Sequence, residues 1–209
     1  SAWSDDNAVL FTFKAGLPMG KTPGGDSGHA HPDEWQVSLD AYGKPLIIDD
    51  GYSYLKLTSN HNVATFDGSG QVWEGSSSFI TNNTGSADII YQDINEAAWY
   101  EYLIADLKDI YKPGLWVTKY IRHVIFLKKN TVVMFDEIET SLSHDIEWRL
   151  HLNQDSNFSL SGTNLFGTIS GSTVGMNIDD ISDEVYIPSI TKENISASGS
   201  TGLLSTFKT

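Results

Sequence analysis

The chain has 209 residues, of which 40% are hydrophobic and 11% aromatic, and its formal net charge is −14. This is a globular composition and not a disordered one, because it supplies enough apolar side chains for a core. The acidic balance argues against nucleic acid as a partner, which requires clustered Lys and Arg. It argues mildly against an anionic polysaccharide, although a basic cleft can exist on an acidic surface. The chain has no cysteine, so any transition metal must be held by His and carboxylate side chains.

Apolar residues recur with a period of two along most of the chain, which is the pattern of half-buried β-strands. In chain order, strands are predicted at 8–14, 35–41, 46–48, 62–66, 71–73, 88–93, 116–127, 131–138 and 145–152. Turn signals separate two pairs of these strands, at Gly43-Lys44-Pro45 and at Lys128-Lys129-Asn130. Short, weakly specified strands follow Asn153 and extend to 184–187.

A single helix is predicted, at 95–107, where alanines favour it although capping residues are missing. No apolar run approaches the roughly 20 residues needed to cross a bilayer, so no membrane partner is expected. Many short strands separated by turns are typical of a sandwich or barrel. We therefore predict one all-β domain over residues 1–209, without repeats or a linker.

The densest cluster of polar side chains lies at residues 28–33, with the sequence GHAHPD. On an extended backbone, His29 and His31 face the same way and could serve one site. Asp49 ends an apolar strand, and His61 begins another. His31, Asp49 and His61 together would form a set of two histidines and one carboxylate, which suits Zn²⁺.

Spacing alone does not bring these three residues together. A tight hairpin at Gly43-Lys44 would place Asp49 opposite Ser38, several residues away from His31. The alternative interpretation is that His29 and His31 are exposed loop residues, that Asp49 caps a turn, and that His61 is a half-buried strand residue.

Several motifs nevertheless occur together in order. The run GHAHPDEWQVSLDAYGKPLIIDDGY at 28–52, followed by NHNVATFDGSGQ at 60–71, resembles the hallmark of the heparinase II/III-like polysaccharide lyase family. The similarity continues through DINEAAWY at 93–100, the strands around Arg122 and Asp136, and EWRLH at 147–151. It covers residues 3 to 153, and five motifs in the right order are a specific signal.

This resemblance implies a large antiparallel β-sandwich from a lyase that cleaves uronate-containing glycans, such as alginate or a glycosaminoglycan, by β-elimination. It implies a zinc ion bound by His31, Asp49 and His61. It also implies a catalytic role for His29. Tyr52 and Tyr54 are the candidates for a tyrosine that acts as base or acid; Tyr54 is taken as the catalytic one, and a structural role is its alternative. Arg122 is the candidate for binding a uronate carboxylate, since guanidinium groups suit carboxylates, and a buried ion pair is the alternative. His151 is interpreted as structural.

The resemblance further implies an N-terminal (α/α) toroid that this sequence does not contain and that would complete the active site. The isolated fragment is then expected to be inactive, and the parent protein to be periplasmic or secreted in a bacterium. Two alternatives stay open. The first is a non-catalytic carbohydrate-binding sandwich whose aromatic residues, such as Trp73 and Trp99, stack on sugars. The second is a structural domain that kept the fold without its chemistry.

Overall fold

The computed structural model describes residues 5, 8–16, 31–49, 56–72, 74–75, 85–95, 97–127, 130–153, 157–161, 164–169, 172–177, 194–197 and 200–208. Within these ranges the regular structure consists of β-strands and three short 3-10 helices, η1 (Thr58–Asn60), η2 (Lys108–Ile110) and η3 (Pro113–Leu115). No helix in the described ranges is long and apolar enough to cross a membrane.

The larger sheet has seven strands, and its path runs β1-β2-β3-β9-β14-β13, with β4 paired to β9 beside that path. These strands are β1 (Val9–Phe13), β2 (Val37–Ala41), β3 (Lys44–Ile47), β4 (Ala64–Phe66), β9 (Ile146–Asn153), β13 (Asn194–Ala197) and β14 (Ser200–Lys208). All of their pairings are antiparallel.

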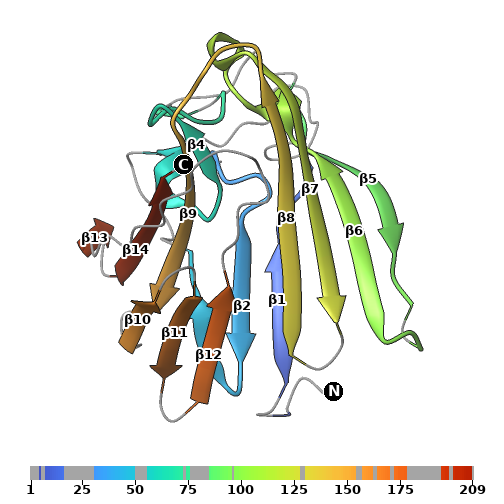
Figure 1. Ribbon diagram of the computed structural model, residues 1–209, viewed down its shortest axis with the longest axis vertical. Coiled ribbons are helices and arrows are strands. Elements are labelled where there is room, and N and C mark those ends of the chain that lie inside the picture. Colours follow the sequence, from blue (N-terminus) through green and yellow to red (C-terminus); the bar gives the residue numbers. More distant parts are fainter. Residues whose placement is uncertain are drawn as a thin grey trace, which may run out of the picture.

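The second sheet has the order β5-β6-β7-β8, and a third, small sheet has the order β10-β11-β12. The strands of these sheets are β5 (Asp88–Asp93), β6 (Tyr100–Asp106), β7 (Val117–Leu127), β8 (Thr131–Thr140), β10 (Asn157–Ser161), β11 (Asn164–Ile169) and β12 (Ser172–Asn177). The long strands β7 and β8 stand beside β6 and β5 at the right of Figure 1, and the small sheet lies at the lower left.

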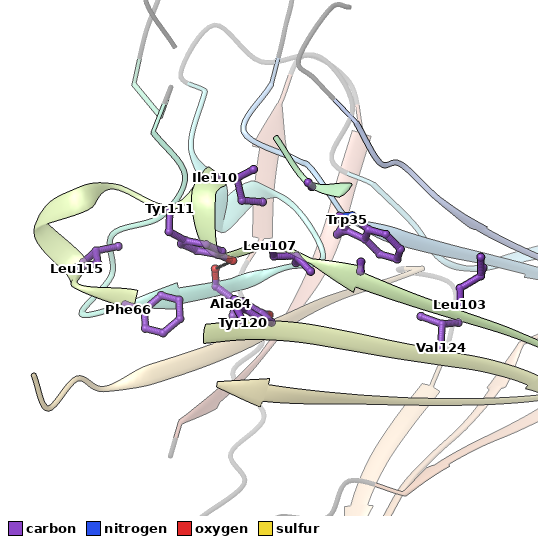
Figure 2. Close-up of a cluster of buried hydrophobic side chains, with 12 residues drawn as sticks. Trp35, Ala64, Phe66, Leu103, Leu107, Ile110, Tyr111, Leu115, Tyr120 and Val124 are labelled. Carbon is purple, nitrogen blue, oxygen red and sulfur yellow. Dashed lines mark hydrogen bonds between the residues drawn. The ribbon is translucent and has the colours of Figure 1, made fainter. Parts of the chain in front are cut away.

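The core lies between the seven-stranded and four-stranded sheets, because both contribute side chains to one buried cluster. Phe66 of β4 comes from the first sheet, and Leu103 of β6 and Val124 of β7 come from the second. Figure 2 shows this cluster, in which the hydroxyl of Tyr111 donates a hydrogen bond to the Ala64 carbonyl over 2.9 Å. Two antiparallel sheets that share a core confirm the predicted β-sandwich.

The predicted helix at 95–107 is wrong. Residues 100–106 form β6, which pairs with β7 and places Leu103 and Ala105 in the core. The alanines that favoured a helix, Ala97 and Ala98, lie in the turn before this strand. Period-two burial against the opposite sheet outweighs local helix propensity here.

Two other predictions need adjustment. Residues 35–41 were predicted as one strand, but β2 starts at Val37 because Trp35 has a left-handed backbone with φ of 62°. The predicted strand at 71–73 is reduced to an isolated bridge between Gln71 and Tyr111. Trp73 and the predicted strand at 184–187 lie outside the described residues.

Strand β5 forms one edge of the four-stranded sheet and pairs with β6. Its apolar side chains are exposed at Ile89 (42%), Ile90 (57%) and Tyr91 (47%). Asp88 begins the strand and Asp93 ends it.

Candidate metal centre

The structure brings together the three residues proposed as metal ligands, although they come from separate segments. His31 Nδ1 lies 3.3 Å from His61 Nε2. His61 Nδ1 lies 2.7 Å from Asp49 Oδ1. Both histidines are buried, with 9% of His31 and 1% of His61 exposed. Asp49 lies two residues after the end of β3, and His61 directly follows η1.

Asn62 explains why these segments meet. Its side-chain Nδ2 donates to the carbonyl of Val37 in β2 over 2.7 Å and to the carbonyl of Ile48 over 2.8 Å. Its Oδ1 accepts from the backbone N–H of His151 in β9 over 2.6 Å. One fully buried amide thus joins three neighbouring segments and sets His61, the preceding residue, beside Asp49.

The segment that carries His31 is anchored through residues 34 and 35. The backbone N–H of Glu34 donates to the side-chain oxygen of Gln71 over 3.1 Å, and Gln71 Nε2 donates back to the Glu34 carbonyl over 3.0 Å. The N–H of Trp35 donates to the Lys14 carbonyl over 2.6 Å. The Trp35 ring stacks on Phe13 with a centroid distance of 4.9 Å. These contacts fix the backbone just after His31.

The hydrogen bonds determine which nitrogen of His61 carries the proton. The Asp49 carboxylate accepts from Nδ1, so a neutral His61 presents the lone pair of Nε2 toward His31. A carboxylate that orients an imidazole in this way is the usual partner of a metal-binding histidine.

The electrostatics of the cluster favour a neutral His31 and an ionised Asp49. Burial, followed by the charge of His61, lowers the pKa of His31. Burial acts to raise the pKa of Asp49, but the hydrogen bond and charge of His61 outweigh it, and the net pKa is lowered. A neutral nitrogen donor next to an ionised carboxylate is the protonation state that a metal requires.

His151 extends this cluster. Its Nδ1 lies 2.9 Å from Asn62 Oδ1. Burial, followed by the charge of His61, lowers the pKa of His151 to about 4. The charge of Asp49 and a backbone hydrogen bond with Ser59 act in the opposite direction.

The donor set fits a zinc ion in part. With bonds of 2.0–2.1 Å, the edge between two nitrogen ligands of a tetrahedral zinc ion is about 3.3–3.4 Å, and His31 Nδ1 and His61 Nε2 are 3.3 Å apart. As the side chains stand, no three His, Asp or Glu groups in the described ranges converge on one point. Asp49 contacts the opposite nitrogen of His61 and must turn to contact the same ion.

Arg122, the candidate for uronate binding, lies in β7 and is fully buried. Its Nε and Nη2 each donate to Asp136 over 2.7 Å, and its Nη1 donates to the Trp35 carbonyl over 2.8 Å. The Tyr120 hydroxyl completes the cluster, 2.9 Å from Arg122 Nη2. Burial acts to lower the pKa of Arg122, but Asp136 outweighs it and the pKa is raised. This arrangement is the buried ion pair that the sequence left as an alternative.

The remaining candidates divide into two groups. The proposed catalytic residues His29 and Tyr54 lie outside the described residues. His123 and His144 are largely buried and pair with exposed carboxylates, with His123 Nε2 lying 2.8 Å from Glu137 and His144 Nδ1 lying 2.6 Å from Asp67. Sequence reasoning assigned no role to Asn62 and only a structural role to His151. The position of Asn62 directly after His61 was the signal available for it.

The fold and this cluster define a β-sandwich domain in which three buried histidines and one carboxylate gather beside the larger sheet. The family model described as "Heparinase II/III-like, C-terminal" matches residues 1–198. The chain belongs to this family.

Solved structures with the same fold include heparan sulfate lyase HepC from Pedobacter heparinus. It is 18% identical with a TM-score of 0.71, over 98% of this chain and 31% of that chain. A mutant of the same protein is 17% identical with a TM-score of 0.73, over 98% and 31% of the two chains. A heparinase III with methylated lysines is 17% identical with a TM-score of 0.71, over 98% and 30%. The chain thus spans less than a third of these proteins. No curated protein matches it in sequence.

Proposed function

We propose that this domain holds a zinc ion through His31 and His61, with Asp49 as the carboxylate of the site, and that it serves a polysaccharide lyase acting on uronate-containing glycans. The observation that carries the proposal is the meeting of these three residues from separate segments, with two imidazole nitrogens 3.3 Å apart. Family membership over residues 1–198 and the likeness to heparan sulfate lyase HepC support the lyase assignment.

A bound zinc ion would supply positive charge that links the segments of residues 31, 49 and 61. The protein's own residues would orient the ligands. Asp49 orients His61 through Nδ1, and Asn62 joins β2, Ile48 and β9 around it. His31, as a ligand of such an ion, would be held in place, and the proposed catalytic residue His29 lies two residues before it in the sequence.

The reaction we propose for the parent protein is β-elimination, in which a base removes the proton from C5 of a uronate and the 4-O-glycosidic bond breaks. His29 and Tyr54 are the proposed catalytic residues of this domain, and a helical domain of the parent chain would supply the remaining groups. An acidic polysaccharide is the proposed partner. On the basis of the family resemblance alone, we propose that the parent protein is periplasmic or secreted in a bacterium.

The first test is the zinc content of the purified domain, for wild type and His31→Ala. We expect about one zinc per wild-type chain, because the two imidazole nitrogens lie 3.3 Å apart, the separation of two ligands of a tetrahedral zinc ion, and a clear loss in the variant. The control is His144→Ala, whose histidine pairs with Asp67 instead. A folded wild-type domain without zinc, even after the metal is added, would contradict the proposal.

The lyase assignment has a separate test. In the parent chain, alginate and heparan sulfate are supplied as substrates, and the unsaturated uronate product is followed by its ultraviolet absorbance. We expect product from one of these glycans and its loss in His29→Ala. Glycan binding without product, undiminished by a chelator, would favour the carbohydrate-binding alternative.

A further inference from the structure

The outer face of the four-stranded sheet, the face turned away from the core, is apolar. Residues that pair across neighbouring antiparallel strands lie on the same face. Two adjoining rows of paired residues form the middle of this outer face, and they are Tyr91, Ile104, His123 and Phe135 in one row and Tyr102, Ile125 and Val133 in the other. The alternate residues of the same strands, such as Leu103 and Val124, belong to the core. A solvated face of an antiparallel sheet usually carries polar residues, whereas this sheet is apolar on both faces.

Much of the outer face is open to solvent within this domain. Tyr91, Val133 and Phe135 are the most exposed residues of the two rows, at 47%, 41% and 40%. None of the residues in these rows is among the side chains that form the described core clusters or pack against them. A contiguous apolar patch on the surface of a domain marks an interaction site. The outer face is therefore a candidate surface for a partner.

The aromatic rings of the outer face pack against one another. The His123 ring stacks on Phe135 with a centroid distance of 4.2 Å and an interplanar angle of 7°, and on Tyr102 at 6.0 Å and 19°. The Tyr102 hydroxyl lies 2.7 Å from His123 Nδ1, and His123 Nε2 lies 2.8 Å from Glu137. Rings that are held in place before a partner arrives reduce the entropy cost of binding. Both faces of the His123 ring are covered by its neighbours, so it offers no platform on which a sugar could stack.

The charged residues beside these two rows are mainly acidic. Glu137 and Glu139 lie on the outer face of β8, and Lys119 of β7 contacts both, at 2.7 Å and 3.6 Å. Asp93 of β5 pairs with Tyr102 of β6. An anionic glycan, or a second copy of this chain, would bring further negative charge to this surface. A partner with Lys and Arg around an apolar centre would be complementary to it.

We propose that the outer face binds another part of the parent chain, through a surface that is apolar at its centre and rich in Lys and Arg at its rim. The solved structures with this fold support such a partner, because the match covers 98% of this chain but only 30–31% of each of those chains. Tyr91 and Phe135 are the expected anchors, since exposed aromatic side chains often dominate the energy of an interface. This inference rests on the longer parent chain of the proposed function, but not on its zinc site or its reaction.

Hydroxyl-radical footprinting of the parent chain, read by mass spectrometry, tests this inference. The oxidation rates of Tyr91 and Phe135 in the folded chain are compared with those in the denatured chain. We expect nearly complete loss of oxidation at both residues on folding, although both are exposed in this domain. Oxidation at the rates of exposed side chains would overturn the inference. Protection that arises only with added alginate or heparan sulfate, or only at higher protein concentration, would also overturn it, because it would assign the outer face to a glycan or to a second copy.

A pair of variants of the parent chain gives a second readout. In Phe135→Lys we expect Tyr91 to become reactive again, because an unpaired charge at the centre of the contact opposes its burial. The matched control is Leu10→Lys, which places the same charge on β1 of the other sheet at a residue that is 39% exposed, and there Tyr91 should stay protected. Continued protection of Tyr91 in Phe135→Lys would contradict the inference. If that variant does not fold, the footprint of the wild type decides. Zinc content, measured on the same samples, tests the metal site separately.

Discussion

At the scale of single residues, Gly70 has no room for a side chain. A Cβ built on Gly70 would overlap the side chain of Thr58, the first residue of η1. Thr58 is fully buried, and its Oγ1 accepts from the N–H of Gln71 over 2.8 Å. The side chain therefore cannot move aside without losing a buried hydrogen bond. Because η1 directly precedes His61, this contact also supports the candidate metal centre.

We predict that Gly70→Ala lowers the free energy of unfolding by about 1–3 kcal/mol, the usual cost of adding a methyl group where there is no space. The measurement is urea unfolding followed by tryptophan fluorescence. Gly114→Ala is the control, since a Cβ at Gly114 meets no atom within 4 Å. Equal losses in both variants would show that the overlap with Thr58 is not the cause.

At the scale of elements, Arg122 connects the two sheets. Arg122 and Asp136 are partners on the neighbouring strands β7 and β8. The guanidinium of Arg122 crosses to the Trp35 carbonyl, two residues before β2 in the opposite sheet. It also lies 5.6 Å from the ring centroid of Trp148 in β9. A charge buried at this position is satisfied by protein groups, which distinguishes a structural ion pair from a site for substrate.

We predict that Arg122→Met destabilises the domain by about 3–5 kcal/mol, because Asp136 would keep a buried charge without its partner. Chemical unfolding measures this loss. Lys119→Met, which removes surface ion pairs to Glu137 and Glu139, is expected to change stability little. If Arg122→Met were as stable as wild type but had lost glycan binding, the substrate-binding interpretation would be favoured instead.

The elements also show what the sequence could predict. The bounds of β7, β8 and β9 were predicted closely. Their apolar residues occupy every second position, and such residues all point to the buried face of a strand. Residues 100–106 were assigned to a helix because local propensity was the only signal there. The contact with β7 that makes them a strand joins residues distant in sequence.

The sequence was sufficient to predict which residues form the candidate site, but not how they are arranged in space. A regular hairpin would set Asp49 opposite Ser38, but a register shift between Leu39 and Asp40 pairs Leu39 with Ile47. No periodic pattern reveals such a bulge. Family motifs indicated which residues belong together, whereas the amide of Asn62, which brings them together, forms its bonds across three segments.

At the scale of the whole molecule, the free energy of unfolding of the metal-free domain should depend on pH. The pKa of His151 is about 4 in the folded protein against 6.5 for the free group, and that of His31 is lowered too. Between these pH values the unfolded chain binds more protons than the folded one. Stability is therefore complete above about pH 6.5 and is lost as the pH falls toward 4.

For His151 the predicted loss is about 3 kcal/mol, at 1.36 kcal/mol per pKa unit. The measurement is urea unfolding of the chelator-treated domain at pH 7 and pH 4.5. In His151→Ala the dependence on pH should be clearly weaker, because the titrating ring is gone. The same loss in that variant would assign the effect to other groups.

The open edge at β5 has a consequence for how the protein behaves at high concentration. An exposed, apolar edge strand is a template for strand addition between molecules. If two copies paired antiparallel about Ile90 and Tyr91, each Asp88 would face an Asp93, and in-register parallel pairing would align identical aspartates. On a chain of net charge −14, repulsion between these carboxylates opposes the pairing of β5 strands from different molecules. We expect added salt, which screens exposed charges, to increase the light scattering of the concentrated domain, and Ile90→Lys to suppress that increase.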